Sequence, residues 1–546
     1  MSAQEASAAA KPRVVDARSL RAMLDDGAEL AILDLREELI FSQNHLLHAR
    51  SLPLSRIELS IDRLVPRRGT RIVLCDDGDG LAERGAAILA RGGYRDVAIL
   101  EGGCAAWEKA GFELFSGVNV PSKAFGEFIE HESGTPSIAA EELARLMRER
   151  ADIAVLDSRP FDEYVRVSIP TATNVPGAEL VLRLRDAVPS PATMVVVNCA
   201  GRTRSIIGAQ SLINAGITNK VVALRNGTMG WSLAGEACDA GKDRRAPAVS
   251  SAGLAAAREA AARVARHFGI ERIDRAMLEH WRGEAEERTL YLLDVRDPAD
   301  YAAGHLPGAI SAPGGQLVQA TDHYVGTLGA RLVLIDDLEV RAIMTASWLV
   351  QMGWKDVFVL AERGAETGFP PPKILGWTER PEIAIAPAAL AELLGRRAAT
   401  VIDLSFSRNF RKAHIGGAWF AIRARLALAL PKIPMKGTLV LTSEDGILAA
   451  LAAAEAQSLV DAPVRVLAGG NEAWQRAGYA MEAGETQMAD EAVDAWLKPY
   501  ERAAKTREAM AEYLAWEVDL LPRIERDGTC HFRRFPPLAP DESRET

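Results

Sequence analysis

Cys199 lies between an apolar run and two arginines in the stretch VVVNCAGRTRSIIGAQ, residues 195–210. The run predicts a buried strand, and an apolar helical pattern starts near Ser205, so Cys199 opens a short loop. Arg202 and Arg204 place two positive charges in that loop. Free amides at the start of a helix favour an anion, and such surroundings lower the pKa of a thiol. The stretch therefore predicts a nucleophilic cysteine.

Four further residues of this loop are candidates for binding a substrate. They are Ala200, Gly201, Thr203 and Ser205. Their backbone amides have no helical partners, and a glycine permits the backbone angles that a tight cradle needs. The guanidinium groups of the two arginines bind oxyanions in a forked geometry. We therefore expect the loop to bind an anion beside the thiol.

The chain repeats one sequence pattern four times. The repeats align on four aspartates: Asp34, Asp157, Asp294 and Asp403. Each repeat has an aromatic residue seven positions later and an alanine fifteen positions later. Three of the repeats have a histidine eleven positions later: His45, His305 and His414. Self-similarity of this kind indicates tandem copies of one structural unit.

Each repeat also contains a short apolar run, a helical pattern, a second apolar run and a glycine turn. The first runs end at Cys75, Cys199, Asp336 and Thr442, and a glycine stands 28 residues after each of them. We take these four positions as equivalent, with an ambiguity of one residue in the last repeat because Ser443 follows Thr442. On this alignment, two of the repeats have a cysteine at the position of Cys199.

Strands that alternate with helices predict an α/β fold, in which each repeat is a mostly parallel sheet flanked by helices. We expect four such modules, at residues 12–117, 135–240, 270–369 and 382–483, and a helical C-terminal tail at residues 484–546. We refer to them in chain order as the first to fourth modules. Each is long enough to form a core of its own.

The segments between the modules are predicted to be linkers, near residues 117–135, 240–270 and 369–382. Within the second of them, residues 250–268 have the Ala-rich pattern of a helix. In the tail, the helical pattern is expected to break or restart at Pro499. The apolar residues before and at this point should pack on a module or on a second subunit; they are Val493, Trp496, Leu497 and Tyr500.

The composition narrows the functional classes. The chain has 546 residues and a net charge of −10, which argues against general binding to nucleic acid or to an anionic membrane. The five cysteines are widely spaced and form no CxxC pair, so we expect neither a disulfide framework nor a metal site. The absence of a signal peptide and of a long apolar run predicts a cytoplasmic protein. The oligomeric state stays open, a homo-oligomer included.

These motifs resemble the rhodanese family of sulfurtransferases, with four rhodanese-like modules in one chain. The resemblance covers nearly all of residues 12–483. It rests on the Asp-x-Arg motif with the sequence GHLPGA, most complete at residues 294–309, and on the CAGRTRS loop. It also rests on three tryptophan-containing turns, EGGCAAW, NGTMGW and AGGNEAW.

The resemblance implies sulfur transfer through a cysteine persulfide. Cys199 would attack the outer sulfur of an anionic donor such as thiosulfate, sulfite would leave, and cyanide or a thiol would take the sulfur from the cysteine. The acceptor could also be a protein that carries sulfur. Such chemistry needs neither a metal nor an organic cofactor. The loop amides and Arg204 would stabilise the anionic donor and the persulfide.

The length of the loop weighs against a phosphatase. Arg204 stands five residues after Cys199, which gives C-x4-R, whereas phosphatases on this fold resemble C-x5-R with a wider cradle. Two alternatives to a sulfurtransferase stay open: a phosphatase or arsenate reductase, and a protein whose modules only bind partners or a persulfide carrier.

The other three modules depart from the pattern of the second. Cys75 is followed by Asp76, Asp77 and Asp79, and negative neighbours raise the pKa of a thiol. Cys75 is therefore a second candidate nucleophile, and the sequence leaves open whether it is active or a relic. Asp336 and Thr442 cannot hold a persulfide, so the third and fourth modules are predicted to be inactive scaffolds.

The remaining motif residues are predicted to serve the fold. Arg36, Arg159 and Arg296 each follow a strand aspartate by two residues, and we expect them to hold their modules together through Asp–Arg hydrogen bonds. The GHLPGA motif lies in the third module, which has no cysteine at the key position. This placement indicates that its histidine supports the fold and takes no part in catalysis.

Overall fold

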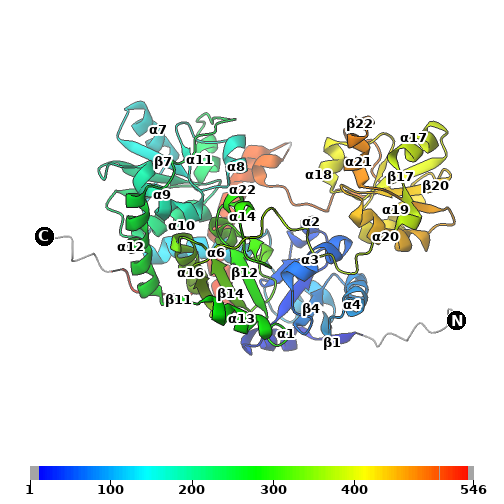
Figure 1. The fold of residues 1–546 in the computed structure, drawn as a ribbon, viewed down its shortest axis with the longest axis horizontal. Helices are drawn as coiled ribbons and strands as arrows, with labels where there is room; N and C mark the ends of the chain where they lie inside the picture. The colour runs from blue at the N-terminus through cyan, green and yellow to red at the C-terminus, as the bar shows by residue number, and fades with distance from the viewer. Residues whose placement is uncertain (1–11, 503, 539–546) are drawn as a thin grey trace.

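The computed structural model describes residues 12–502 and 504–538 of the chain (Figure 1). In these residues the four repeats form four sheets of five parallel strands each. In every sheet the strands lie in the order first, fifth, fourth, second and third. Their short runs of Val, Ile and Leu are buried, as expected where helices cover both faces of a parallel sheet. The predicted α/β fold is confirmed.

The first two modules have the same sequence of elements. The first contains β1 (Arg13–Val15), α1 (Ala17–Asp25), β2 (Ala31–Asp34), α2 (Glu38–Phe41), β3 (Ala49–Ser51), α3 (Ile57–Leu64), β4 (Arg71–Cys75), α4 (Leu81–Arg91), β5 (Asp96–Leu100) and α5 (Gly103–Lys109). The second contains β6 (Ser137–Ile138), α7 (Ala140–Arg148), β7 (Ile153–Asp157), α8 (Phe161–Arg166), β8 (Thr173–Asn174), α9 (Leu180–Ala187), β9 (Met194–Asn198), α10 (Thr203–Asn214), β10 (Val221–Leu224) and α11 (Gly227–Leu233).

The last two modules vary this plan. The third contains β11 (Glu271–Arg272), α13 (Arg275–Gly283), β12 (Leu290–Asp294), α14 (Pro298–Ala303), β13 (Ile310–Ser311), α15 (Gly314–Gln319), β14 (Arg331–Ile335), α16 (Val340–Gln351) and β15 (Val357–Leu360), and residues 361–380 after it form no helix. The fourth contains β16 (Ala384–Ile385), α17 (Pro387–Gly395), β17 (Ala399–Asp403), α18 (Ser407–Lys412), β18 (His414–Ile415), β19 (Trp419–Phe420), α19 (Leu426–Ala429), β20 (Thr438–Thr442), α20 (Ile447–Gln457), β21 (Val464–Leu467), α21 (Gly470–Arg476) and β22 (Met481–Glu482).

Two helices connect the modules. The predicted helix at 250–268 is α12 (Ser251–Phe268), with the Ser250 side chain capping its start and Gly269 in a left-handed conformation at its end. The predicted linker at 117–135 holds the helix α6 (Val120–Ser133), which the sequence pattern did not indicate. This helix is covered by α10 on one side and by the C-terminal tail on another, so most of its residues are buried.

The second and third modules share one hydrophobic core. A single cluster of buried apolar side chains contains residues of both modules, between Phe125 and Val359 in the sequence. The helix α12 packs against α9 of the second module and α16 of the third. Across this core the Trp348 indole donates a hydrogen bond of 2.9 Å to the hydroxyl of Ser211. The two modules are therefore fixed against each other by burial of apolar surface.

The first module contacts both the third and the fourth. Leu30 and Leu328 form an antiparallel bridge between the first and third modules. Arg423 and Glu58 form a buried ion pair of 2.7 Å between the fourth and the first. Figure 1 shows the fourth module at one end of the molecule, next to the first module and away from the second.

The tail differs in part from its prediction. Residues 485–498 contain no helix, a short 3₁₀ turn begins at Pro499, and one long helix follows, α22 (Thr506–Asp527). The predicted helix before Pro499 is wrong because tertiary contacts hold this segment in an open conformation: Asp494 accepts a hydrogen bond of 2.6 Å from the Ser407 amide, and Trp496 packs on the first module. The predicted packing of the tail on the modules is confirmed.

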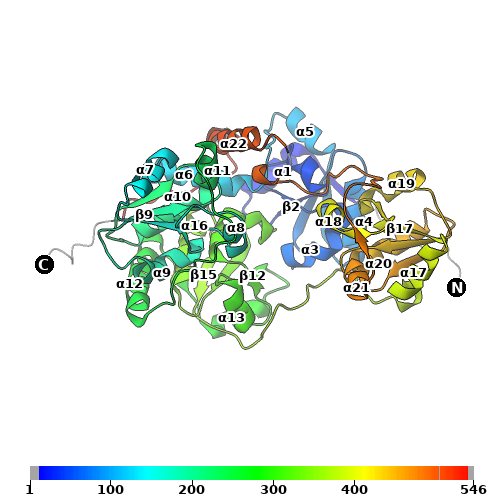
Figure 2. The same cartoon turned by 90° about the horizontal axis from the view of Figure 1, so that it is seen from above.

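The helix α22 lies between the first and second modules, as Figure 2 shows from above. Arg507 donates hydrogen bonds to the carbonyls of Ser232 and Leu233 in the second module. Trp516 and Arg523 bond to the segment that ends the first module. No helix of the described part of the chain is both long and apolar enough to cross a membrane.

The predicted Asp–Arg pairs are present in three modules. Arg159 donates to both carboxylate oxygens of Asp157, at 2.9 and 2.6 Å, and to the carbonyl of Val167 at 2.6 Å. Arg36 and Arg296 make the same bonds to their aspartates. All three arginines are buried, so they tie the end of a strand to the loop beside it.

The three motif histidines are also structural. Each imidazole stacks on the aromatic ring four residues earlier, with ring centroids 3.9 to 4.0 Å apart: Phe41 with His45, Tyr301 with His305, and Phe410 with His414. All three histidines are buried. The predicted role of His305 in the fold agrees with this packing, and His45 and His414 are placed in the same way.

Candidate functional site

The pairing of the strands defines which residues are equivalent in the four modules. Asp157 lies opposite Asn198 in the second module, so Cys199 is the first residue beyond the paired strand. In the first module Asp34 lies opposite Cys75. Cys75 is thus equivalent to Asn198, and the position of Cys199 is occupied by Asp76. By the same register the equivalents in the third and fourth modules are Asp336 and Ser443.

A glycine contact confirms this register. A Cβ atom added at Gly227 would lie 2.4 Å from the Cys199 carbonyl oxygen. At Gly103 it would lie 2.1 Å from the Asp76 carbonyl, and at Gly470 it would lie 2.2 Å from the Ser443 carbonyl. The predicted equivalence of Cys75 and Thr442 with Cys199 is therefore wrong by one residue. The spacing to the glycine is the cause: Gly227 follows Cys199 by 28 residues, whereas Gly103 follows Asp76, and Gly470 follows Ser443, by 27.

The register changes the interpretation of Cys75. This residue is fully buried in the strand β4, and burial raises the pKa of its thiol well above the ordinary value. The loop beyond it is closed by Asp76, whose carboxylate accepts hydrogen bonds from the amides of Gly78 at 2.9 Å and Ala82 at 3.0 Å. A carboxylate thus takes the place of the sulfur and fills the anion cradle of the first module.

The third module fills its cradle in a similar way. Arg341 is the counterpart of Arg204, and its guanidinium donates to the Asp336 carboxylate at 3.0 Å. Arg341 also bonds to Asp300 at 3.0 Å and to Glu179 of the second module at 2.9 Å. In the fourth module the Ser443 hydroxyl accepts from the Ala449 amide at 3.3 Å. Among the four equivalent positions, Cys199 is the one that carries sulfur.

Cys199 is held at the carboxyl edge of its sheet, at the start of α10. The residue is 2% exposed, and its sulfur lies 3.5 Å from the Ser205 hydroxyl oxygen. Its carbonyl accepts hydrogen bonds from the amide and the hydroxyl of Thr228, at 2.8 and 3.0 Å. The carbonyl of Ala200 accepts from the Met229 amide at 2.9 Å. These bonds fix the loop against α11.

Arg204 is a cation close to this thiol, and one of its N–H donors makes no hydrogen bond to the described part of the chain. Its guanidinium donates to Glu163 at 2.8 Å and to Gln316, which comes from the third module, at 2.8 Å. Its Nε is buried and has no hydrogen-bond partner among the described residues. Although burial acts in the opposite direction, Arg204 and Lys498 hold the pKa of the Glu163 carboxyl below its usual range.

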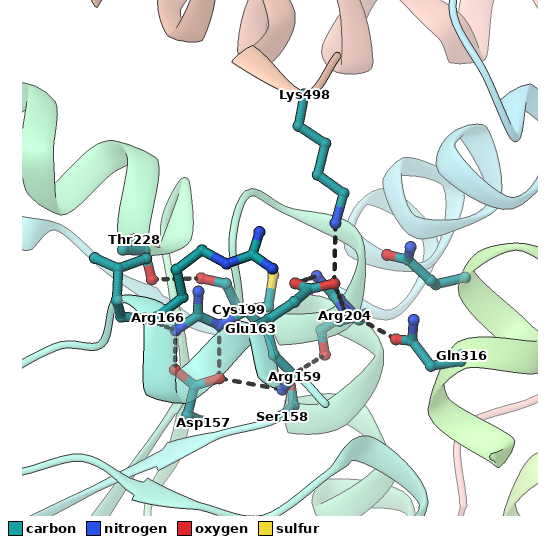
Figure 3. Close-up of polar contacts among 12 residues, drawn as sticks. Asp157, Ser158, Arg159, Glu163, Arg166, Cys199, Arg204, Thr228, Gln316 and Lys498 are labelled. Atoms are coloured by element: carbon teal, nitrogen blue, oxygen red, sulfur yellow. Dashed lines mark hydrogen bonds and ion pairs between the residues drawn. The ribbon is translucent and has the colours of Figure 1, made fainter. Parts of the chain in front are cut away.

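Lys498 completes this group from the C-terminal tail. Its ammonium donates to Glu163 at 3.0 Å, and Figure 3 shows it reaching from the tail toward Glu163 and Arg204. Two cations therefore share one carboxylate beside Cys199. The group carries a net positive charge that favours a bound anion.

Arg202 is placed differently from Arg204. Its guanidinium donates to both carboxylate oxygens of Glu127 at 2.7 Å, to Glu130, and to Asn226 at 3.1 Å. The expectation of two unopposed charges in this loop is therefore wrong. Glu127 and Glu130 lie on α6, the helix that the sequence pattern presented as a linker, so the partners of Arg202 were hidden.

A small cavity of about 70 Å³ lies over the loop. All the candidate residues of this loop except Ser205 line the cavity, and the Ser205 hydroxyl lies 3.5 Å from the cysteine sulfur. The tail supplies much of the remaining wall: Trp496, Lys498, Pro499, Tyr500, Tyr513 and Glu517. The sequence predicted that the tail packs on a module, but nothing in its pattern indicated that it covers the cysteine.

Glu517 of α22 lies close to the loop. Its Oε1 accepts hydrogen bonds from the hydroxyls of Tyr513 at 3.1 Å and Thr203 at 3.4 Å, and it pairs with Lys123 at 3.3 Å. Its Oε2 is buried without a hydrogen-bond partner among the described residues. In the described part of the chain no group of three or more potential metal ligands gathers.

The close contact at Gly227 leads to a testable prediction. This residue has φ of +53°, and a Cβ would collide with the Cys199 carbonyl at 2.4 Å. We expect Gly227→Ala to lower the free energy of unfolding by about 2 kcal/mol or more and the turnover by about tenfold, because the cysteine is displaced. Denaturant titration and a steady-state assay measure both effects.

Gly235→Ala is the matched control for this prediction. Gly235 has φ of +84°, but nothing lies within 4 Å of its added Cβ. This variant carries the backbone penalty without the collision, and its turnover should match that of the wild type. Equal turnover in the two variants would show that the contact at Gly227 does not position Cys199.

The fold and the loop define a class of protein. The model of the Rhodanese-like domain family matches four stretches of the chain, residues 16–110, 139–234, 277–362 and 386–477. The chain therefore belongs to the rhodanese family and carries four rhodanese-like domains. The resemblance seen in the sequence is confirmed.

A similar protein of known structure matches the whole arrangement. The crystal structure titled thiosulfate sulfurtransferase from Pseudomonas aeruginosa is 50% identical in sequence, with a TM-score of 0.91. The match covers 96% of this chain and 100% of that one. Two curated proteins from strains of Mycobacterium tuberculosis, each named probable adenylyltransferase/sulfurtransferase MoeZ, are 33% identical over 108 residues. That match spans 20% of this chain and 27% of those relatives.

Proposed function

We propose that this protein is a sulfurtransferase that moves sulfane sulfur from thiosulfate or a related anion to cyanide or a small thiol through a persulfide on Cys199. One observation carries the proposal: among the four equivalent loops, only that of the second module combines a sulfur atom with an arginine donor left free for a ligand, the Nε of Arg204. The similar structure titled thiosulfate sulfurtransferase supports the same donor.

The first step transfers the outer sulfur of the donor. The Cys199 thiolate attacks this sulfur, the S–S bond of thiosulfate breaks, and sulfite leaves with the bonding electron pair. Arg204 and the first amides of α10 stabilise the anionic donor and the negative charge of the persulfide. Arg202 holds the loop against α6 through its bonds to Glu127. Ala200, Gly201, Thr203 and Ser205 complete the cradle. The thiolate is the reactive form of the cysteine.

The second step returns the cysteine to its first state. Cyanide attacks the terminal sulfur of the persulfide, the S–S bond breaks, thiocyanate leaves, and the electron pair stays on the Cys199 thiolate. A thiolate acceptor reacts in the same way and leaves as a persulfide. No proton, metal or organic cofactor enters this balance.

The cavity indicates which acceptors fit. A volume of about 70 Å³ holds a small anion but no segment of a partner protein. The tail would have to leave its place between the first and second modules before a protein carrier could reach Cys199. A small acceptor needs no such movement, so we favour cyanide or a low-molecular-weight thiol.

The first, third and fourth modules are proposed to be scaffolds. Asp76 and Asp336 place carboxylates where the sulfur would stand, and Ser443 places a hydroxyl there. None of these groups can hold a persulfide. The third module nevertheless contributes Gln316 to Arg204, so it supports the site of the second.

Mass spectrometry of the intact protein tests the proposal. After incubation with thiosulfate we expect one added sulfur atom per chain, which cyanide removes with release of thiocyanate. Peptide mapping should place it on Cys199. A chain that gains no sulfur from thiosulfate would favour the alternative, a non-catalytic protein whose modules bind partners or a persulfide carrier.

The wall formed by Tyr500 gives a prediction about the acceptor. Tyr500 lines the cavity from the tail and packs near Met229, Met510 and Leu514. We expect Tyr500→Ala to raise the rate with glutathione relative to the rate with cyanide several-fold, because a larger acceptor gains room. Parallel steady-state assays with the two acceptors measure this ratio.

Tyr479→Ala is the control for Tyr500→Ala. Tyr479 packs on Trp474 in the fourth module, away from the cavity. Its loss removes the same side chain from the protein but should leave the ratio unchanged. If the ratio also stays unchanged in Tyr500→Ala, the tail does not limit the size of the acceptor.

A further inference from the structure

A second cavity lies where the first module, the third module and the end of the chain meet. Its volume is about 240 Å³, enough for several water molecules of roughly 30 Å³ each. Its wall includes Arg50 from β3, Asp322 from the third module, and the segment Thr529–Phe532 after α22. None of these residues belongs to the site of Cys199.

Arg50 is the unusual member of this wall. The residue is 4% exposed, and its Nε donates to the Val325 carbonyl at 3.1 Å. Its Nη1 is buried and has no hydrogen-bond partner among the described residues. Asp322 acts on its charge from a distance. A buried cation without a partner is costly, so the geometry leaves a donor free for a ligand.

The wall as a whole, with Arg50 included, has a positive balance. Arg288 and Lys355 also line the cavity, and two carboxylates oppose the three cations. One of them, Asp356, is already held by Arg288, and Asp322 remains as the second. Burial lowers the pKa of His48 to about 3, so this imidazole is neutral. The three cations therefore exceed the two carboxylates by one charge.

A helix terminus points to the same kind of ligand. The first turn of α6, at Pro121 and Ser122, lines the cavity. α6 is 14 residues long, and the start of such a helix carries partial positive charge and free amides; Pro121 has no N–H, so the free amides of this turn belong to its other residues. This feature is independent of Arg50, and both favour an anion.

We propose that this cavity binds a small oxyanion, a sulfur oxyanion or phosphate, on the guanidinium of Arg50. Cys530 lines the same cavity, but burial raises the pKa of its thiol to about 12. The thiol therefore stays protonated, and the site binds its ligand without covalent chemistry. The ligand would bridge the first module, the third module and the end of the chain, and so stabilise their contact.

Thermal unfolding of the full chain tests this site. Sodium sulfate, thiosulfate and phosphate, each compared with chloride at equal ionic strength, should raise the unfolding midpoint of the wild type and of Arg204→Met by a few degrees in a saturable way. Arg50→Met should lose this response, and Arg50→Lys should keep a weaker one. The anion with the lowest half-saturation concentration distinguishes a sulfur oxyanion from phosphate.

Two further measurements keep the proposal falsifiable. Arg145→Met removes an equal charge from an exposed pair on α7 and should respond to anions like the wild type. Crystals soaked in selenate should show anomalous density at the Arg50 guanidinium. The proposal is overturned if Arg50→Met and Arg50→Lys both respond like the wild type, or if selenate binds elsewhere and leaves this cavity empty.

Discussion

Cys199→Ala is expected to abolish sulfur transfer from thiosulfate to cyanide, with a loss of turnover of about a thousandfold or more. In the proposed mechanism the cysteine attacks the donor and carries the sulfur, and no other sulfur stands at an equivalent position in the described modules. The variant should also gain no sulfur from thiosulfate. A cyanide-dependent thiocyanate assay and the mass of the intact protein measure these two effects.

Cys75→Ala is the matched control for this variant. It removes a buried thiol from the corresponding strand end of the first module. Its cradle is filled by Asp76, so turnover and the sulfur adduct should be those of the wild type. If Cys199→Ala kept its activity and Cys75→Ala lost it, the chemistry would belong to the first module and our assignment would be wrong.

Arg204→Met is expected to lower kcat/KM for thiosulfate by about a hundredfold. The substitution removes the donor beside Cys199 and leaves Glu163, half-buried and negative, with Lys498 as its remaining partner. The anionic donor then meets net repulsion in place of attraction. Steady-state kinetics should show much of the loss as a higher KM, because binding of the donor is affected as well as the reaction.

Two comparison variants separate charge from structure. Arg202→Met removes an equal charge from the same loop, but this charge is already held by Glu127 and Glu130. Because Glu127 is then buried without its partner, the loss should appear mainly as a lower free energy of unfolding, and kcat/KM should fall by less than about tenfold. The double variant Arg204→Met/Glu163→Gln also removes the carboxylate that Arg204 had paired. If it restored both stability and activity, Arg204 would act by balancing Glu163 and not by binding the donor.

The sequence pattern was sufficient for the fold because its information is local. Runs of Val, Ile and Leu, the helical patterns between them and the repeated aspartates all lie within one module. The same is true of the Asp–Arg pairs, which are two residues apart in the chain. The register of the loops was less certain, since the spacing between the loop position and the following glycine differs by one residue between modules. Only the pairing with Asp157 shows that Cys75 lies one position earlier than Cys199.

By itself, the sequence determined the four α/β modules, and it predicted the nucleophile and the loop that surrounds it. The tertiary structure alone decided which charges act at that loop and what covers it. Arg202 meets Glu127 across 75 residues of sequence, Arg204 meets Gln316 across 112, and Glu163 meets Lys498 across 335. Contacts at such separations follow from how the modules and the tail pack together, and no local spacing encodes them. They turn an apparently open, basic loop into a small, covered cavity whose arginines and lysine are paired with glutamates.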